Sequence, residues 1–225
     1  AHLGQEDALT LRCRRIQRIV VRPEYQGQGI GRWMLEQLES ASVKQIDYLA
    51  SSFGVDLPLA RFWSRSGYIP VRVGDRIRAA SGLHSAVVLK AVSSPATRLI
   101  HQSRALFLPQ LSAQLSRHLN RLSPLLVCEL GKAGPRQAAL NTQQLKTAFL
   151  FAFALRPYES CLETLIRLAD FTLSGGTEQT ETPPAFRELL IARVLQLRSW
   201  SECARLLQLE GRQECVSLLR AGVRS

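Results

Sequence analysis

One short stretch of this chain, at residues 18–38, limits its possible folds more than any other: RIVVRPEYQGQGIGRWMLEQL. Its apolar start leads into a turn that contains three glycines, and apolar residues at helical spacing follow the turn. Closely spaced glycines let a backbone approach a ligand, and the free N–H groups at the start of a helix favour an anion there. The stretch therefore predicts a strand, a phosphate-binding turn and a helix in succession.

Two common phosphate-binding motifs do not match this turn. A P-loop requires a Lys-Ser or Lys-Thr pair after its last glycine, whereas Arg32 follows Gly31 here. A dinucleotide-binding GxGxxG motif requires a third glycine at position 32, where this chain again has arginine. The spacing that remains is Gln26-x-x-Gly29-x-Gly31, which excludes both nucleotide-binding loops.

Residues 1–92 are predicted to alternate strands with helices, a pattern typical of a layered α/β or α+β domain. Hydrophobic periodicity predicts strands at 16–21, 46–54, 68–74 and 84–92, and helices at 29–42 and 58–66. Gly67 follows the second helix, as glycine commonly does at a helix C-terminus.

Residues 93–225 are predicted to be helical throughout. Apolar spacing predicts helices near 99–122, 142–155, 158–173, 185–197 and 199–221, and an N-cap signal stands at the start of the second. A polar segment at 174–184 is expected to connect two of them. The sequence thus predicts two domains, residues 1–92 and residues 93–225.

The charge of the chain is strongly positive and is carried mostly by arginine. It has 29 basic and 18 acidic residues, a net charge of +11, and only four of the basic residues are lysines. Arginine binds phosphate oxygens with two parallel hydrogen bonds and stacks on bases, which favours a nucleic-acid partner. The alternative is a genome that encodes surface cations as arginine. Residues 91–225 hold 16 basic and 10 acidic residues, so the helical region is either a nucleic-acid surface or a solvated helical face.

Several other classes of protein are not expected. No run approaches the roughly 20 apolar residues of a membrane span, and the first residues carry no secretory signal. The five cysteines are scattered without CxxC or Cys/His spacing, so we expect a reduced cytoplasmic protein without a metal site. The chain does not begin with methionine, and we expect it to be a piece of a longer protein.

Two blocks resemble motifs of a known superfamily. Together with Val21-x-Pro23 upstream, the glycine spacing resembles motif A of the GNAT superfamily of acetyl-CoA-dependent N-acetyltransferases, and LARFWSRSGY at 59–68 resembles motif B. The resemblance implies that the anion is the pyrophosphate of coenzyme A. Many members carry a tyrosine acid four residues before the motif B glycine. Trp63 takes that place here, and because an indole N–H does not release a proton at useful pH, the usual acid is missing from its usual place. We expect the Trp63 side chain to pack in the core, and the alternative is an indole that stacks on a base.

Five segments in order narrow the resemblance to the bacterial tRNA(Met) cytidine acetyltransferases, the TmcA family, over roughly residues 15–90: RIVVRPEYQGQGIGR, DYLASSFG, RFWSRSGY, VRVGDRIRAASG and HSAVVLK. In the tail, AFLFAFALRP at 148–157 is similar to a family stretch. The resemblance implies an α+β fold: an N-terminally incomplete GNAT mixed sheet with flanking helices, followed by an all-helical domain that binds tRNA. It implies acetylation of cytidine N4 at the wobble position of elongator tRNA(Met), with ATP used only by an upstream helicase module that these residues do not contain.

The resemblance assigns eleven residues to acetyl-CoA. The strand backbone would follow the pantetheine arm, the turn would hold the phosphates, and one further arginine would add a cation; these residues are Ile19, Val20, Val21, Gln26, Gly27, Gln28, Gly29, Ile30, Gly31, Arg32 and Arg65. The acidic acetyl-CoA contact of the family aligns with Pro58, which supplies neither a charge nor a backbone donor.

The catalytic base is not identified by the sequence. His84, Ser81 and Asp75 lie in or beside the family-like segments and are candidates, and the alternative for His84 is an ordinary strand residue. Two other functions stay open: a GNAT enzyme acting on a protein or a small amine, and a non-catalytic RNA-binding fragment with a degenerate fold. The sequence does not indicate the oligomeric state.

Overall fold

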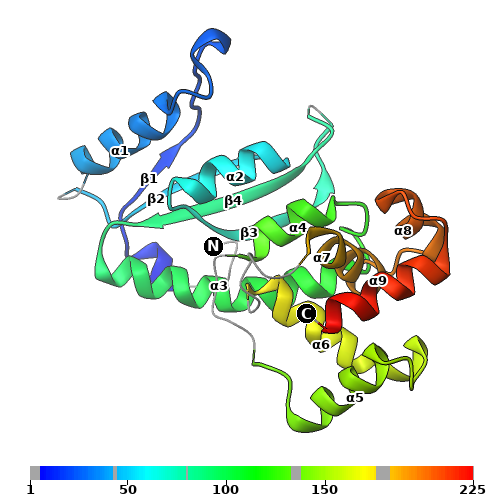
Figure 1. The fold of residues 1–225 in the computed structure, drawn as a ribbon. Helices are drawn as coiled ribbons and strands as arrows, with labels where there is room; N and C mark the ends of the chain where they lie inside the picture. The colour runs from blue at the N-terminus through cyan, green and yellow to red at the C-terminus, as the bar shows by residue number, and fades with distance from the viewer. Residues whose placement is uncertain (1–5, 43–44, 80, 133–137, 176–182, 225) are drawn as a thin grey trace. The chain divides into compact units, whose positions relative to one another are not determined.

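The computed structural model describes residues 6–42, 45–79, 81–132, 138–175 and 183–224 (Figure 1). The chain divides into two compact units, Ala1–Pro109 and Gln110–Ser225. The first contains a mixed four-stranded sheet with helices, and the described part of the second is helical. The predicted fold class, an α+β domain followed by an all-helical region, is therefore confirmed.

The sheet has the strand order β1-β2-β4-β3. Strand β1 (Cys13–Ile16) runs parallel to β2 (Tyr48–Gly54), whereas β4 (His84–Ala91) is antiparallel to both β2 and β3 (Ile69–Ile77). The pairing of β1 with β2 stops where Ile16 faces Ser51.

The predicted strand at 16–21 was wrong in its position. The strand ends at Ile16, and residues 17–22 have no strand partner among the residues that the structure describes. Apolar residues at 19–21 gave a strand pattern, but pairing with a neighbour is a tertiary property that a local pattern does not contain.

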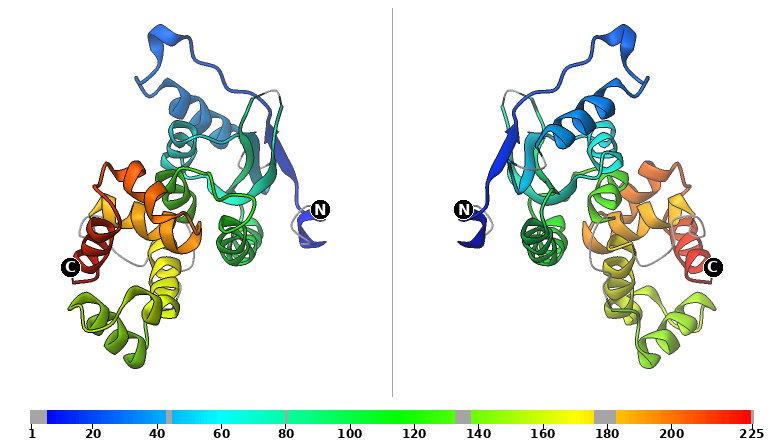
Figure 2. Two further views of the ribbon diagram at one scale, coloured as in Figure 1. Left: turned by 90° about the vertical axis from the view of Figure 1, so that its right-hand side faces the viewer. Right: turned by 90° about the vertical axis from the view of Figure 1, so that its left-hand side faces the viewer.

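Helices α1 (Ile30–Ser42) and α2 (Leu57–Arg65) cover one face of the sheet (Figure 2). Leu35 of α1 and Trp63 of α2 pack there against Leu49 of β2. The Trp63 ring lies 4.8 Å from the Tyr68 ring in an edge-to-face arrangement, and only 3% of this tryptophan is exposed. The expectation that Trp63 packs in the core is confirmed.

Helix α3 (Ser94–Leu115) covers the opposite face of the sheet, where Ile100 packs against Val71 and Leu89. Arg104 of the same helix is fully buried and donates a hydrogen bond of 2.8 Å from Nη1 to the carbonyl oxygen of Pro70. Burial lowers the pKa of Arg104 to about 9. The first part of α3 therefore belongs to the sheet.

The division between the two units falls inside α3, directly after Pro109. The sequence placed its domain boundary between residues 92 and 93, close to the start of this helix, because the change from strands to helices occurs there. A change of secondary structure is a local signal, whereas the division of a chain into compact units depends on which faces pack together.

The second unit continues with six further helices in its described residues: α4 (Pro124–Gly131), α5 (Thr142–Ala152), α6 (Leu162–Leu173), α7 (Pro184–Leu190), α8 (Trp200–Leu207) and α9 (Arg212–Arg224). A 3₁₀ turn at Tyr158–Cys161 precedes α6, and a π-turn at Ile191–Leu195 follows α7.

The helix predictions for this unit were correct in part. The predicted N-cap is present, because Asn141 forms a reciprocal capping box with Gln144 at the start of α5. Helix α4 was missed, and the single helix predicted at 199–221 is two helices, separated where Gln208 adopts a left-handed conformation with φ 57°. The predicted connector at 174–184 lies largely outside the described residues.

No helix in the described ranges is long and apolar enough to cross a bilayer. The described residues also contain no group of three or more His, Cys, Asp or Glu side chains arranged to hold a metal ion. All five cysteines are described, and none of them forms a disulfide.

Candidate active site

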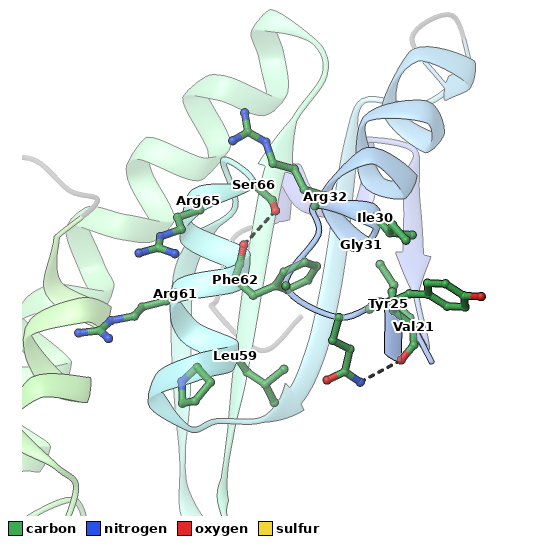
Figure 3. A pocket seen from close by; sticks show the side chains of 15 residues that line it. Val21, Tyr25, Ile30, Gly31, Arg32, Leu59, Arg61, Phe62, Arg65 and Ser66 are labelled. Carbon is green, nitrogen blue, oxygen red and sulfur yellow. Dashed lines mark hydrogen bonds between the residues drawn. The ribbon is translucent and has the colours of Figure 1, made fainter. Parts of the chain in front are cut away.

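A cleft of about 670 Å³ lies between the glycine turn and helix α2 in the first unit (Figure 3). It brings together nine of the eleven residues that the sequence assigned to the cofactor: Ile19, Val21, Gln26, Gly27, Gly29, Ile30, Gly31, Arg32 and Arg65. The other two, Val20 and Gln28, do not line it. That these residues bind a cofactor stays a prediction.

The backbone of the turn requires glycine at two positions. Gly27 and Gly29 have φ angles of 75° and 83°, in a region that side chains rarely tolerate, and no atom lies within 4 Å of where a Cβ would stand. The turn is held from behind by Gln26, whose Nε2 donates to the carbonyl oxygen of Val21 at 2.9 Å. Gln28 makes a similar bond of 3.1 Å to the carbonyl oxygen of Glu24. Both glutamine side chains therefore fix the shape of the turn.

The start of α1 presents free backbone donors to the cleft. The N–H of Trp33 donates to the carbonyl oxygen of Gly29 at 2.9 Å. By contrast, no acceptor within the described part of the chain is hydrogen-bonded to the N–H groups of Ile30, Gly31 or Arg32. Three such donors, together with the positive end of the helix dipole, form a site suited to an anion.

Gly31 has a different role from the other two glycines, because it allows a close approach between α1 and α2. A Cβ at this position would stand 3.1 Å from Cε2 of Phe62 and 3.7 Å from Cγ2 of Val21. The Phe62 ring therefore occupies the space that a side chain would need, and it forms one wall of the cleft.

Three arginines line the cleft, Arg32, Arg61 and Arg65, and their guanidinium groups point in different directions. Nε of Arg32 lies 2.9 Å from Oε1 of Glu36, one turn further along α1. Figure 3 shows the guanidinium groups of Arg61 and Arg65 on the side of α2 away from the Phe62 ring. Sequence reasoning named Arg65 but missed Arg61, although the two are four residues apart on one helix and so share a face.

Pro58 is placed where a proline costs little. It lies in the first turn of α2, where its missing N–H would be unpaired in any case. Asp56 caps this helix by accepting a hydrogen bond of 2.8 Å from the N–H of Leu59. Sequence reasoning did not assign Leu59, Phe62, Ser66 or Tyr25 to the cleft, which the structure places there.

None of the three candidate bases lines the cleft. His84 is buried in β4 with Nδ1 2.9 Å from the carbonyl oxygen of Gly74, as expected of an ordinary strand residue. Asp75 is exposed near the end of β3, and the Ser81 hydroxyl accepts a bond of 3.4 Å from the N–H of Leu83. The structure does not bring these side chains to the candidate site.

Comparison with known families matches both units. Residues 32–93 match the family described as GNAT acetyltransferase 2, and residues 104–225 match the family described as tRNA-binding domain. The first match begins at Arg32, so it includes α2 and most of α1 but not the glycine turn, and the second match covers more than half of the chain.

Relatives with known names agree with these families. A tRNA(Met) cytidine acetyltransferase TmcA from Nitrosococcus halophilus is 38% identical over 207 residues, which is 91% of this chain and 28% of that protein. A protein of the same name from Salmonella typhimurium is 35% identical over 176 residues, 76% of this chain and 24% of its own length. A third, from Thermofilum pendens, is 28% identical over 199 residues, 84% of this chain and 24% of its own length.

The chain spans about a quarter of the length of these curated relatives. Its two matched regions, a GNAT region and a tRNA-binding region, come in the order that the sequence analysis expected. The chain therefore belongs to the family of GNAT acetyltransferases with a tRNA-binding domain, and it is similar to the tRNA(Met) cytidine acetyltransferases named TmcA.

Proposed function

We propose that this chain is the acetyl-transfer and tRNA-binding part of a tRNA(Met) cytidine acetyltransferase. In this function the acetyl group of acetyl-CoA is transferred to the N4 amine of cytidine at the wobble position of elongator tRNA(Met). The observation that carries the proposal is the cleft, because it joins a glycine turn with free N–H donors to the unpaired segment after β1, in a chain that belongs to this family.

The cleft fits acetyl-CoA at two places. The N–H groups of Ile30, Gly31 and Arg32 would receive the pyrophosphate. Upstream, the N–H groups of residues 18–20 have no hydrogen-bond acceptor among the described residues, so this extended segment would pair with the amides of the pantetheine arm. Bound acetyl-CoA supplies a thioester carbonyl that an amine can attack.

The transfer balances without an oxidant, a reductant or a metal. The bond between the thioester carbon and sulfur breaks as the bond from that carbon to N4 forms, the amine loses a proton, and the departing thiolate gains one. The cytosine amine is conjugated with its ring and is hardly basic, so the protein must mainly position it and polarise the carbonyl. Trp63 does not serve as the acid, because it is buried and an indole N–H is not acidic enough.

The second unit would hold the tRNA. Residues 104–225 match a tRNA-binding family, and the helical region carries an excess of arginine. ATP is expected to act only through a helicase module of the parent protein, because these 225 residues contain no P-loop sequence.

A substitution in the turn tests the placement of acetyl-CoA. Gly29→Glu brings a carboxylate to the point where the pyrophosphate is expected, so acetyl-CoA affinity should fall at least 100-fold, about 2.8 kcal/mol, while tRNA affinity stays within about twofold. Calorimetric titration with acetyl-CoA and filter binding of tRNA(Met) measure the two affinities.

Gly29→Asn is the matched control, because asparagine tolerates a positive φ better than most residues and adds no charge. It should lose less than tenfold in acetyl-CoA affinity. If the glutamate variant bound acetyl-CoA like the unaltered chain, the pyrophosphate would not lie at this turn. A parent protein that bound acetyl-CoA but never formed N4-acetylcytidine in tRNA(Met) would refute the proposed function.

A further inference from the structure

A second cavity, of about 410 Å³, lies within the helical unit and is not part of the acetyl-CoA cleft. We call it the basic pocket. It is lined by eight residues from two segments, the turn after α3 and the stretch from the π-turn into α8: Asn120, Arg121, Gln196, Leu197, Arg198, Glu202, Arg205 and Leu206. Its volume is within the range of small-ligand sites.

The inner side of the basic pocket is held by hydrogen bonds to backbone carbonyls. Gln196 is only 2% exposed, and its Nε2 donates to the carbonyl oxygens of Leu119 at 3.3 Å and Leu122 at 2.8 Å. Arg198 donates from Nε to Asn120 at 3.0 Å and from Nη2 to Leu122 at 2.7 Å, again at the carbonyl oxygens. These four bonds tie the two segments together, so the pocket is preformed.

The backbone that places these side chains is unusual. The π-turn Ile191–Leu195 comes directly before Gln196, and Leu197 follows with φ 54°, a left-handed conformation that leucine rarely adopts. As a result Gln196 points inward, whereas Leu197 remains 59% exposed at the pocket. The left-handed residue lets the N–H of Arg198 donate to the carbonyl oxygen of Ala192 at 3.0 Å, which closes the turn and leaves the Leu197 side chain at the pocket.

The basic pocket has an excess of positive charge. No carboxylate of the described residues forms an ion pair with Arg121, Arg198 or Arg205. The one acid that lines it, Glu202, accepts hydrogen bonds at Oε2 from the N–H and the hydroxyl of Ser199, at 2.8 and 2.7 Å, and so caps α8.

The pKa of Arg198 is lowered mainly by burial. Cys203 and Glu202 act in the opposite direction, and the nearby charge of Arg121 adds the smallest effect, which lowers the pKa. Two like charges close together at a preformed cavity are stabilised by a bound anion.

We infer that the basic pocket binds a phosphate group of the tRNA backbone, with the attached nucleoside against its apolar side. Arg121 and Arg205 are both exposed and would contact the phosphate, because guanidinium forks match phosphate oxygens. Leu197 and Leu206 would contact the sugar or base. This inference rests on the proposed function for its choice of tRNA, and the pocket lies wholly within the region that matches a tRNA-binding family.

The test uses the full chain with Arg121→Ala and Arg205→Ala combined, and measures its affinity for tRNA(Met) at several salt concentrations. Each phosphate contact adds roughly 0.7–0.9 to the slope of log affinity against log salt. Because both arginines contact one phosphate, the double variant should bind tRNA about tenfold more weakly, with a slope shallower by about 1. Unchanged affinity and slope would overturn the inference.

Arg167→Ala is the matched control. Arg167 is an exposed arginine of the same unit but pairs with Glu163, with Nε and Oε1 3.4 Å apart, so its loss should leave the slope unchanged. Arg198 is left in place because it holds two carbonyl groups, and its removal would endanger the fold. Circular dichroism should show the same helix content for both variants and the unaltered chain.

The same phosphate chemistry could come from a free nucleotide, and a second titration separates the two sources. Adenosine 5′-monophosphate should bind the unaltered chain weakly, compete with tRNA, and not bind the double variant. If the double variant lost nucleotide binding but kept its affinity for tRNA, the pocket would bind a free nucleotide. That result would overturn the inference that it binds a phosphate of tRNA. Acetyl-CoA affinity and N4-acetylcytidine formation in the parent are measured in parallel. The two proposals are therefore tested separately. The double variant can leave tRNA affinity unchanged while acetyl-CoA still binds and N4-acetylcytidine still forms, and acetyl-CoA binding or acetylation can be absent while the basic pocket still binds tRNA.

Discussion

At the scale of single residues, the glycines of the turn show that one motif can contain two different requirements. Gly27 and Gly29 are needed for their positive φ angles and face open space, whereas Gly31 is needed because Phe62 lies against it. The sequence predicted that the glycines form one phosphate cradle. It could not separate these roles, because the position of Phe62 beside Gly31 depends on the packing of two helices.

Gly31→Ala tests the second requirement. A methyl group 3.1 Å from the Phe62 ring must push that ring aside, which should cost about 1–2 kcal/mol of the free energy of unfolding. Phe62→Leu in the same chain should recover part of this loss, because it removes the atoms that clash. Urea unfolding of the two single variants and the double variant gives the coupling energy. Strictly additive losses would show that the two residues do not contact each other.

Four side chains in the first unit show which roles the sequence could predict and which it could not. The resemblance grouped Gln26 and Gln28 with the cofactor contacts, and the structure shows both bonded to backbone carbonyls. Core packing of Trp63 was predicted correctly, because a bulky apolar side chain on the apolar face of a helix is most stable in the hydrophobic core. His84 was ambiguous, because burial and a carbonyl partner decide its role, and neither is visible along the chain.

At the scale of elements, the predictions succeeded where local chemistry determines the structure. The capping box at Asn141 marks the start of α5, and the glycine after α2 marks its end. They failed where an element depends on distant partners, as at the end of β1, or on a strained residue. Gln208 and Leu197 both adopt left-handed conformations without a sequence signal, so the break between α8 and α9 and the shape of the basic pocket were not predictable.

An exposed aromatic pair at the end of helix α5, Phe149 in the helix and Phe153 at its C-cap, should affect tRNA binding in a different way from the arginines. Phe149 and Phe153 are 57% and 51% exposed, and their ring centroids lie 4.5 Å apart. Aromatic side chains stack on unpaired bases with about 1–3 kcal/mol per base. Replacing both by alanine should therefore weaken tRNA binding about tenfold without changing the salt slope.

Leu145→Ala is the control for the aromatic pair, because Leu145 lies one turn before Phe149 and is 56% exposed but has no ring. It should change tRNA affinity less than twofold. An equal loss for the leucine and the aromatic variants would indicate a general apolar contact instead of base stacking. Fluorescence anisotropy with labelled tRNA measures all three affinities under the same salt.

At the scale of the whole molecule, the sheet of the first unit depends on a helix that comes after its last strand in the sequence, α3. Ile100 and Arg104 pack on the sheet face opposite α1 and α2, although the strand pattern ends near residue 92. A chain of residues 1–92 would leave Val71 and Leu89 exposed, at a cost of about 25 cal/mol per Å² of apolar surface. We therefore expect it to aggregate or to unfold without cooperativity.

A chain of residues 1–109, which keeps the part of α3 that belongs to the first unit, should stay soluble and unfold in one cooperative transition. Differential scanning calorimetry of the two lengths makes the comparison. The control is Ile100→Asp in the longer chain, which keeps the length but places a charge against Val71 and Leu89, so it should behave like the shorter chain. Equal unfolding temperatures for residues 1–92 and 1–109 would show that α3 is dispensable for the sheet.

The unpaired segment after β1 has a consequence for how this site tolerates mutation. If residues 18–20 hold the pantetheine arm through their backbone, the ligand recognises the spacing of amide groups rather than particular side chains. The Val20 side chain is 71% exposed and does not line the cleft, so its identity should be nearly free. Proline alone removes the N–H that such pairing uses. Substitutions other than proline should therefore accumulate at residue 20 without loss of function. Ile19, which lines the cleft and packs against the core, should stay apolar, and the glycines a few residues later should stay constant.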